Sequence, residues 1–129
     1  MKKLEKDSII GISALLVHAA NIDEIYSEQE KNLIKDFINS YLTDIDTNKI
    51  LKEAENIEKN SNQLLNYTNI IKKNSLDIKK DIIEHLWKVI ISDNSVDQYE
   101  SNLMRRICGL IYFPDKESAE IKLKLLNSR

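Results

Sequence analysis

Two short acidic segments hold the residues of this sequence that are best suited to ligand chemistry. The first runs from Asp23 to Glu30, and the second contains Asp93, Asp97 and Glu100. Hard cations such as Ca²⁺ and Mg²⁺ prefer carboxylate oxygens, and backbone carbonyls and water can complete the coordination shell. The sequence therefore predicts a weak calcium or magnesium site at these segments. The second segment is favoured, because it has aspartate at two positions of the motif.

A purely structural role accounts for part of each segment. Ser27 and Glu30 fit a capping box, and so do Asp97 and Glu100. In this motif the first side chain accepts from a backbone N–H of the first helical turn, and the glutamate reaches back to the cap residue. The capping box does not explain the aspartate that begins each segment. This residue stands at the end of the preceding helix, where a negative charge is mildly unfavourable. It either forms an Asx turn or holds a cation.

Recognised catalytic and ligand motifs are missing from the rest of the chain. It has no phosphate-binding loop, dinucleotide fingerprint, nucleophile elbow or Cys/His zinc pattern. The second acidic segment is too short for the twelve-residue loop of an EF-hand. His18 and His85 belong to no ligand pattern, and Cys108 and Trp87 are expected in the core. We therefore expect no enzymatic activity, and no cofactor other than a weakly bound calcium or magnesium ion.

Composition limits the partners and the compartment. The 129 residues include 19 basic and 21 acidic side chains, so the net charge of −2 gives no broad attraction to nucleic acid or anionic lipid. A single cysteine cannot form an internal disulfide, which favours a cytoplasmic setting. The apolar run over residues 9–20 is too short to span a bilayer. We expect a protein partner, no nucleic acid and no membrane insertion.

The elements that must position the acidic segments are predicted to be helices. Only two Gly and one Pro occur, whereas the tight turns of a strand-rich domain depend on these residues. Apolar residues recur at the spacing of one helical face. The sequence predicts a single all-α domain over residues 1–129, with about seven helices. Four of them are expected to cover residues 3–21, 47–59, 61–73 and 116–126. The other three are expected to begin near residue 27, after an N-cap at Ser75, and near residue 97.

The two acidic segments belong to an internal repeat. A shift of 70 positions aligns residues 16–33 with residues 86–103 without a gap. The repeat units cover about residues 9–42 and 78–113, and each is a helix–corner–helix hairpin that cannot bury its apolar face alone. We therefore expect two hairpins related by approximate two-fold symmetry. The identical pairs are Leu16/Leu86, Asp23/Asp93, Glu30/Glu100, Asn32/Asn102 and Leu33/Leu103.

On these residues the chain resembles the tellurite-resistance TerB-like family, which includes the N-terminal domain of the DjlA co-chaperones. That family has an Asp-Gly-x-apolar-x-x-x-Glu pattern at two helical corners. Residues 23–30 and 93–100 match the pattern, with Glu24 and Asn94 in place of its glycine. The resemblance spans about residues 9–113. It implies an all-α fold, no established catalytic activity, a loose link to stress response and membrane-associated complexes, and acidic corners suspected of binding cations.

Two hypotheses of different classes follow. The first is a non-enzymatic module in a stress response whose helical surface binds a protein partner that the sequence does not identify. The second is a small cation-binding or cation-sensing domain. Its expected ligands are Asp23, Glu30, Asp93, Asp97 and Glu100.

Overall fold

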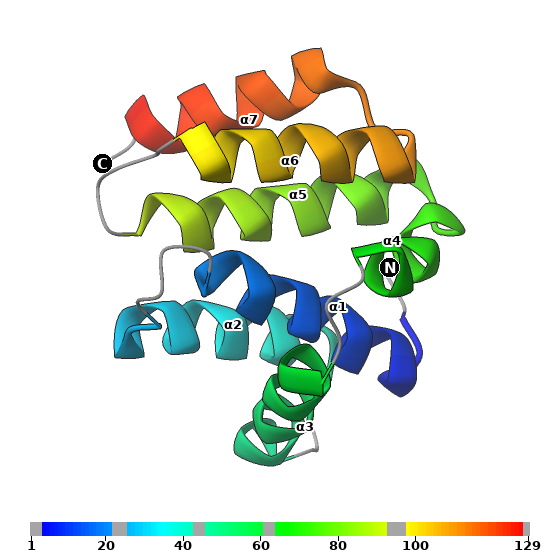
Figure 1. The fold of residues 1–129 in the computed structure, drawn as a ribbon, viewed down its shortest axis with the longest axis vertical. Helices are drawn as coiled ribbons and strands as arrows, with labels where there is room; N and C mark the ends of the chain where they lie inside the picture. The colour runs from blue at the N-terminus through cyan, green and yellow to red at the C-terminus, as the bar shows by residue number, and fades with distance from the viewer. Residues whose placement is uncertain (1–3, 22–25, 43–45, 61–63, 93–97, 128–129) are drawn as a thin grey trace.

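The computed structural model describes residues 4–21, 26–42, 46–60, 64–92 and 98–127, and these form helices and no strands (Figure 1). The predicted all-α fold is therefore confirmed, and each predicted helix begins and ends within a few residues of an observed one. The helices are α1 (Lys6–Ala20), α2 (Glu28–Tyr41), α3 (Thr47–Asn60), α4 (Leu64–Lys72), α5 (Leu76–Ile91), α6 (Gln98–Ile111) and α7 (Asp115–Asn127). None of these described helices is long and apolar enough to cross a membrane.

The helices are arranged in two layers (Figure 1). Helices α1 and α2 form one layer, and α5, α6 and α7 form the other. Helix α3 lies across the outer side of the first layer and packs against both of its helices, while α4 packs against α1 and α6 at the side. Because α1 packs against α2, α3, α4 and α5, it is the central helix of the fold.

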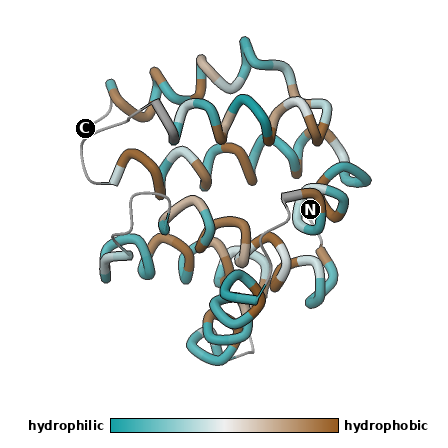
Figure 2. Tube along the Cα trace, in the orientation of Figure 1, coloured by the Kyte–Doolittle hydropathy of each residue, from teal (hydrophilic) through white to brown (hydrophobic). Residues whose placement is uncertain are grey.

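The central position of α1 follows from its composition. Every residue from 9 to 17 is buried, so the helix has no solvated face over this length. A helix that is apolar all round belongs in the centre of a bundle. Figure 2 shows hydrophobic stretches on α1 and α5 where the two layers meet. Gly11 lets α4 approach closely, because a Cβ atom at this position would lie 2.5 Å from Cδ1 of Ile70.

The helix boundaries agree with the 70-residue repeat. Helix α5 begins 70 positions after α1, and α6 begins and ends 70 positions after α2. Leu16 and Leu86 are both 0% exposed, and the glutamates at equivalent positions, Glu30 and Glu100, are both buried. Leu33 is half-buried. The approximate two-fold relation between the two hairpins stays a prediction.

Ser13 places an unpaired hydroxyl in the middle of the core. Its side chain is 0% exposed, and its Oγ has no hydrogen-bond partner among the described residues. An unpaired buried hydroxyl costs about 1–3 kcal/mol, and alanine also has the higher helix propensity. We therefore expect Ser13→Ala to raise the free energy of unfolding by about 1 kcal/mol in urea denaturation. Ser8→Ala, at a half-buried position of the same helix, is the control. A loss of stability in Ser13→Ala would contradict the prediction.

Helix α6 ends in a turn that directs the chain into α7. Tyr112 adopts a left-handed backbone conformation with φ of 61°, and the N–H of Phe113 donates to the carbonyl of Cys108 at 2.9 Å. This 6→1 bond is that of the Schellman motif, in which glycine usually holds the left-handed position. Pro114 follows, and α7 begins at Asp115. The turn brings α7 back against α5 and α6.

Candidate functional site

The N-terminus of α2 is closed by the predicted capping box. The Ser27 Oγ accepts from the N–H of Glu30 at 3.2 Å, and Glu30 Oε1 accepts from the N–H of Ser27 at 2.8 Å. The Ser27 hydroxyl also donates to Glu30 Oε1 at 3.1 Å. Glu30 is only 6% exposed, so the box satisfies a buried carboxylate as well as the helix end. The prediction that Ser27 is an N-cap is confirmed. Its counterpart Asp97 lies outside the described residues.

Loss of this cap should have a measurable effect on stability. We expect Ser27→Ala to lower the free energy of unfolding by about 1 kcal/mol, because one orphan N–H and the Glu30 carboxylate both lose a partner. Ser27→Thr keeps a hydroxyl cap and should retain most of that stability. Thermal and urea denaturation of the two variants measures the difference. Equal stability of the alanine and threonine variants would remove the energetic role of the cap.

The five predicted cation ligands are only partly described. Glu30 and Glu100 are buried, at 6% and 4% exposed, and Glu30 is used in the capping box. Asp23, Asp93 and Asp97 lie outside the described residues. In the part of the chain that the structure describes, no group of three or more His, Cys, Asp or Glu is placed to hold a metal ion. The cation site therefore stays a prediction.

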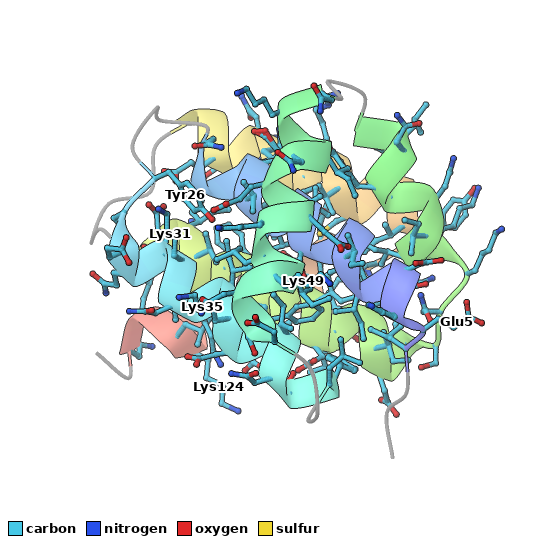
Figure 3. All side chains as sticks on the ribbon, turned by 90° about the horizontal axis from the view of Figure 1, so that it is seen from below. Glu5, Tyr26, Lys31, Lys35, Lys49 and Lys124 are labelled. Atoms are coloured by element: carbon cyan, nitrogen blue, oxygen red, sulfur yellow. The ribbon has the colours of Figure 1, made fainter. Side chains whose placement is uncertain are left out.

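Helix α3 adds two carboxylates beside the first acidic segment. The hydroxyl of Tyr26 donates to Oε2 of Glu55 at 2.7 Å, and Nδ2 of Asn21 donates to Oε1 of Glu58 at 3.0 Å. Figure 3 shows Tyr26 next to Lys31, whose Nζ lies 5.0 Å from the centroid of the Tyr26 ring. Burial, followed by the hydrogen bond to Glu55, raises the pKa of Tyr26, so its hydroxyl stays protonated and donates.

These residues line a small open cavity of about 370 Å³. Asn21 and Tyr26 flank residues 22–25 in the sequence, and each of them is bonded to one of the two α3 carboxylates. Sequence reasoning missed Glu55 and Glu58 because they are far from the corner along the chain and belong to no short motif. They add two carboxylates to the cavity that Asn21 and Tyr26 line.

A second polar group joins the two layers. The hydroxyl of Tyr41 on α2 donates to Oδ2 of Asp81 on α5 at 2.6 Å. The Nε2 atom of His85 lies 3.7 Å from Oδ1 of the same aspartate, and the Phe37 and His85 rings make an edge-to-face contact with 5.1 Å between their centroids. Burial lowers the pKa of His85, and it outweighs the opposing effect of Asp81. Burial also raises the pKa of Tyr41, and the hydrogen bond to Asp81 raises it further.

The lowered pKa of His85 makes stability depend on pH. The folded protein binds the imidazole proton less readily than the unfolded chain, so stability is full above the unfolded pKa of about 6.5 and falls as the pH drops through the lowered folded pKa. We expect His85→Gln to weaken the loss of stability between about pH 7 and pH 5. Urea midpoints at the two pH values measure it, with His18→Gln as control. An unchanged pH dependence in His85→Gln would contradict the prediction.

A cavity of about 470 Å³ lies over Trp87, where α5, α6 and α7 meet. Nε1 of Trp87 donates to Oγ of Ser118 at 2.9 Å, and Nζ of Lys122 lies 5.3 Å from the centroid of the indole. Trp87 is 4% exposed and Cys108 is 1% exposed, so both are core residues as predicted. The lining consists of Trp87, Ser101, Met104, Arg105, Asp115, Ser118, Ala119 and Lys122.

Helix α7 is apolar on two sides. Ser118 and Ile121 are buried against the bundle, with Leu125 partly buried. Leu123 is 57% exposed and Leu126 is 36% exposed. Together with exposed Ala119, four positions before Leu123, these leucines form an outward stripe at the spacing of one helical face. We call Ala119, Leu123 and Leu126 the α7 stripe.

A second groove, of about 560 Å³, follows the other side of α7. Its charged walls come from α5 and α7, and Ile121 and Leu125 contribute its apolar surface. The charged residues are Lys80, Glu84, Lys88, Glu117, Glu120 and Lys124, so lysines and glutamates are equally represented. This groove therefore has no preferred sign of charge.

A family model described as tellurite resistance protein TerB matches residues 10–123. The match extends from α1 into α7 and includes both acidic segments. Comparison with curated proteins gave no match, and comparison with solved structures gave none either.

Proposed function

Because this chain belongs to the TerB family of tellurite resistance proteins, we propose that it is a non-enzymatic helical module that binds a partner protein in a stress response. The observation that carries the proposal is the α7 stripe, in which two leucines of a surface helix face away from the core. A surface helix ordinarily has a polar outer face. A partner that covers these leucines would remove apolar surface from water, which is favourable by about 25 cal/mol for each Å² buried.

The spacing of the stripe fits a known mode of recognition. Ala119, Leu123 and Leu126 occupy positions i, i+4 and i+7 of one helix. Anchors at this spacing are what an amphipathic helix presents to a partner groove or to a second helix. The stripe does not depend on the acidic corners, so protein binding and cation binding can be tested separately.

Charge substitution on the stripe tests the proposal. Affinity capture from the source cells should recover a protein with the wild-type chain and lose it with Leu123→Glu plus Leu126→Glu. Leu65→Glu, at a position of α4 that is 52% exposed, is the matched control and should still capture it. Titration of the purified partner then gives the affinity. If no captured protein distinguishes the stripe variant from the control, the proposal is overturned.

A cation-binding function is the second candidate, and the α3 carboxylates beside the first corner favour it. We expect weak binding, with a dissociation constant of about 10⁻⁴–10⁻³ M. Calorimetric and NMR titrations with Ca²⁺ and Mg²⁺ on the wild type, Asp23→Asn and Asp93→Asn would locate the ion. Shifts confined to residues 91–100 and lost in Asp93→Asn would assign it to the second corner. No binding at millimolar ion would leave the acidic residues as caps and turn formers.

Absence of turnover and a cytoplasmic location complete the proposal. The missing catalytic motifs and the family resemblance support the absence of turnover. The single cysteine supports a cytoplasmic location. Turnover of an ester, nucleotide or peptide by the purified protein, abolished by one substitution, would overturn the first. Fractionation of the source cells tests the second.

A further inference from the structure

We propose that the cavity over Trp87 selects the partner of the α7 stripe by taking an aspartate or glutamate side chain from an acidic amphipathic helix. This inference rests on the proposed function, because it identifies the chemistry of the protein segment that the stripe binds. The cavity and the stripe are defined by residues of α5, α6 and α7.

The cavity and the stripe form one continuous surface. Ala119 belongs to the stripe and also lines the cavity. Lys122, which precedes Leu123 on α7, stands on the cavity side, and Arg105 contributes from α6. The first and last residues of the stripe are seven positions apart, about 10 Å along the helix axis, which suits about two turns of a partner helix. A segment that lies on the leucines therefore passes the mouth of the cavity.

The charges of the cavity favour an anionic group. Arg105 and Lys122 provide two cations against one acid, Asp115, although the whole chain carries a net charge of −2. Among the described residues neither cation has an ion-pair partner, and Lys122 lies with its Nζ over the face of the Trp87 indole. An arginine fork binds a carboxylate through two parallel hydrogen bonds, and such charge-assisted bonds are about twice as strong as neutral ones. A carboxylate of the partner would satisfy both cations.

The floor of the cavity is formed by two buried apolar side chains. Trp87 is 4% exposed and Met104 is 1% exposed, so they supply a packed base below the cations. The one donor of the indole is already used by Ser118, which fixes the ring and leaves no unpaired polar atom on it. The methylene groups of a glutamate can lie on this floor while its carboxylate reaches the rim.

Two synthetic peptides of 18 residues test the inference. Both carry leucines at i, i+3, i+4 and i+7, and one has glutamate beside this stripe where the other has glutamine. Trp87 is the only tryptophan of the chain, so its fluorescence reports on the cavity itself. We expect the glutamate peptide to change the Trp87 emission and to bind about tenfold more tightly than the glutamine peptide, with affinity that falls as salt is added.

Substitution at the rim provides the matched controls. Arg105→Gln plus Lys122→Gln should remove most of the preference for glutamate, and Arg106→Gln, an exposed neighbour that does not line the cavity, should keep it. Arg105→Glu plus Lys122→Glu should favour a lysine-flanked peptide instead. Circular dichroism checks that each variant is folded.

The possible results separate the two proposals. If stripe variants lose the captured partner but both peptides bind alike, the inference is overturned and the proposed function stands. If neither the partner nor the peptides depend on Leu123 and Leu126, both are overturned. Binding of phosphatidylserine vesicles or single-stranded DNA through Arg105 and Lys122, without peptide binding, would overturn the inference in favour of those ligands.

Discussion

Replacing Phe37 with alanine is expected to lower the free energy of unfolding by about 3–5 kcal/mol. Phe37 is 0% exposed and lies where α2 meets α5. Its ring centroid lies 5.2 Å from that of Tyr41 and 5.1 Å from that of His85. Removal of the ring leaves a cavity between the two layers and exposes the polar group of Tyr41, Asp81 and His85 to water. Urea denaturation followed by circular dichroism measures the loss.

Two further variants show that the loss comes from packing. Asn32→Ala removes an exposed side chain from the same helix and should change stability by less than about 0.5 kcal/mol. Phe37→Leu fills part of the cavity and should cost clearly less than Phe37→Ala. A loss below about 1 kcal/mol in Phe37→Ala would mean that the two layers do not meet at this ring.

Leu16→Ala and Leu86→Ala are expected to cost about 2–5 kcal/mol each. Both leucines are 0% exposed, and they stand 70 positions apart at the same place in the two repeat units. Because the two environments are equally buried, we expect similar losses from the two single variants. Thermal and urea denaturation of both proteins under one set of conditions measures them.

Exposed leucines give the control for this pair. Leu65→Ala and Leu76→Ala remove the same atoms from positions that are 52% and 54% exposed, and each should cost less than about 0.5 kcal/mol. Strongly unequal losses of stability at Leu16 and Leu86 would show that the two leucines do not occupy equivalent core positions, although the helix boundaries of the two repeat units agree.

The helices could be predicted because their signals are local. An apolar run such as that of α1 is typical of a central helix. The prediction of Ser75 as the N-cap of α5 is confirmed, because its side chain accepts from the N–H of Ile78. Pro114 directly precedes α7, and proline is a local signal for the end of a helix. These signals are formed by residues that are close together in the sequence, so they can be recognised without knowledge of the tertiary structure. The packing of α4 between α1 and α6 depends on distant contacts and could not be predicted.

The candidate sites divide in the same way. The capping box of Ser27 and Glu30 spans four residues and was predicted from their identities. The α3 carboxylates come from 29 and 37 positions away from their partners Tyr26 and Asn21, and the Asp81 bond to Tyr41 spans 40. No short pattern encodes such pairs. The α7 stripe was missed for a different reason: with leucines on opposite sides of the helix, the sequence does not indicate which ones face outward.

Cys108 can report on transient openings between α6 and α7. The thiol is 1% exposed, and burial raises its pKa, so very little reactive thiolate meets the solvent while α6 and α7 are packed. A thiol reagent can therefore modify the native chain only during brief openings of this region. Since the chain has no other cysteine, the rate of modification, divided by the rate for the unfolded chain, gives the free energy of that one opening without any substitution.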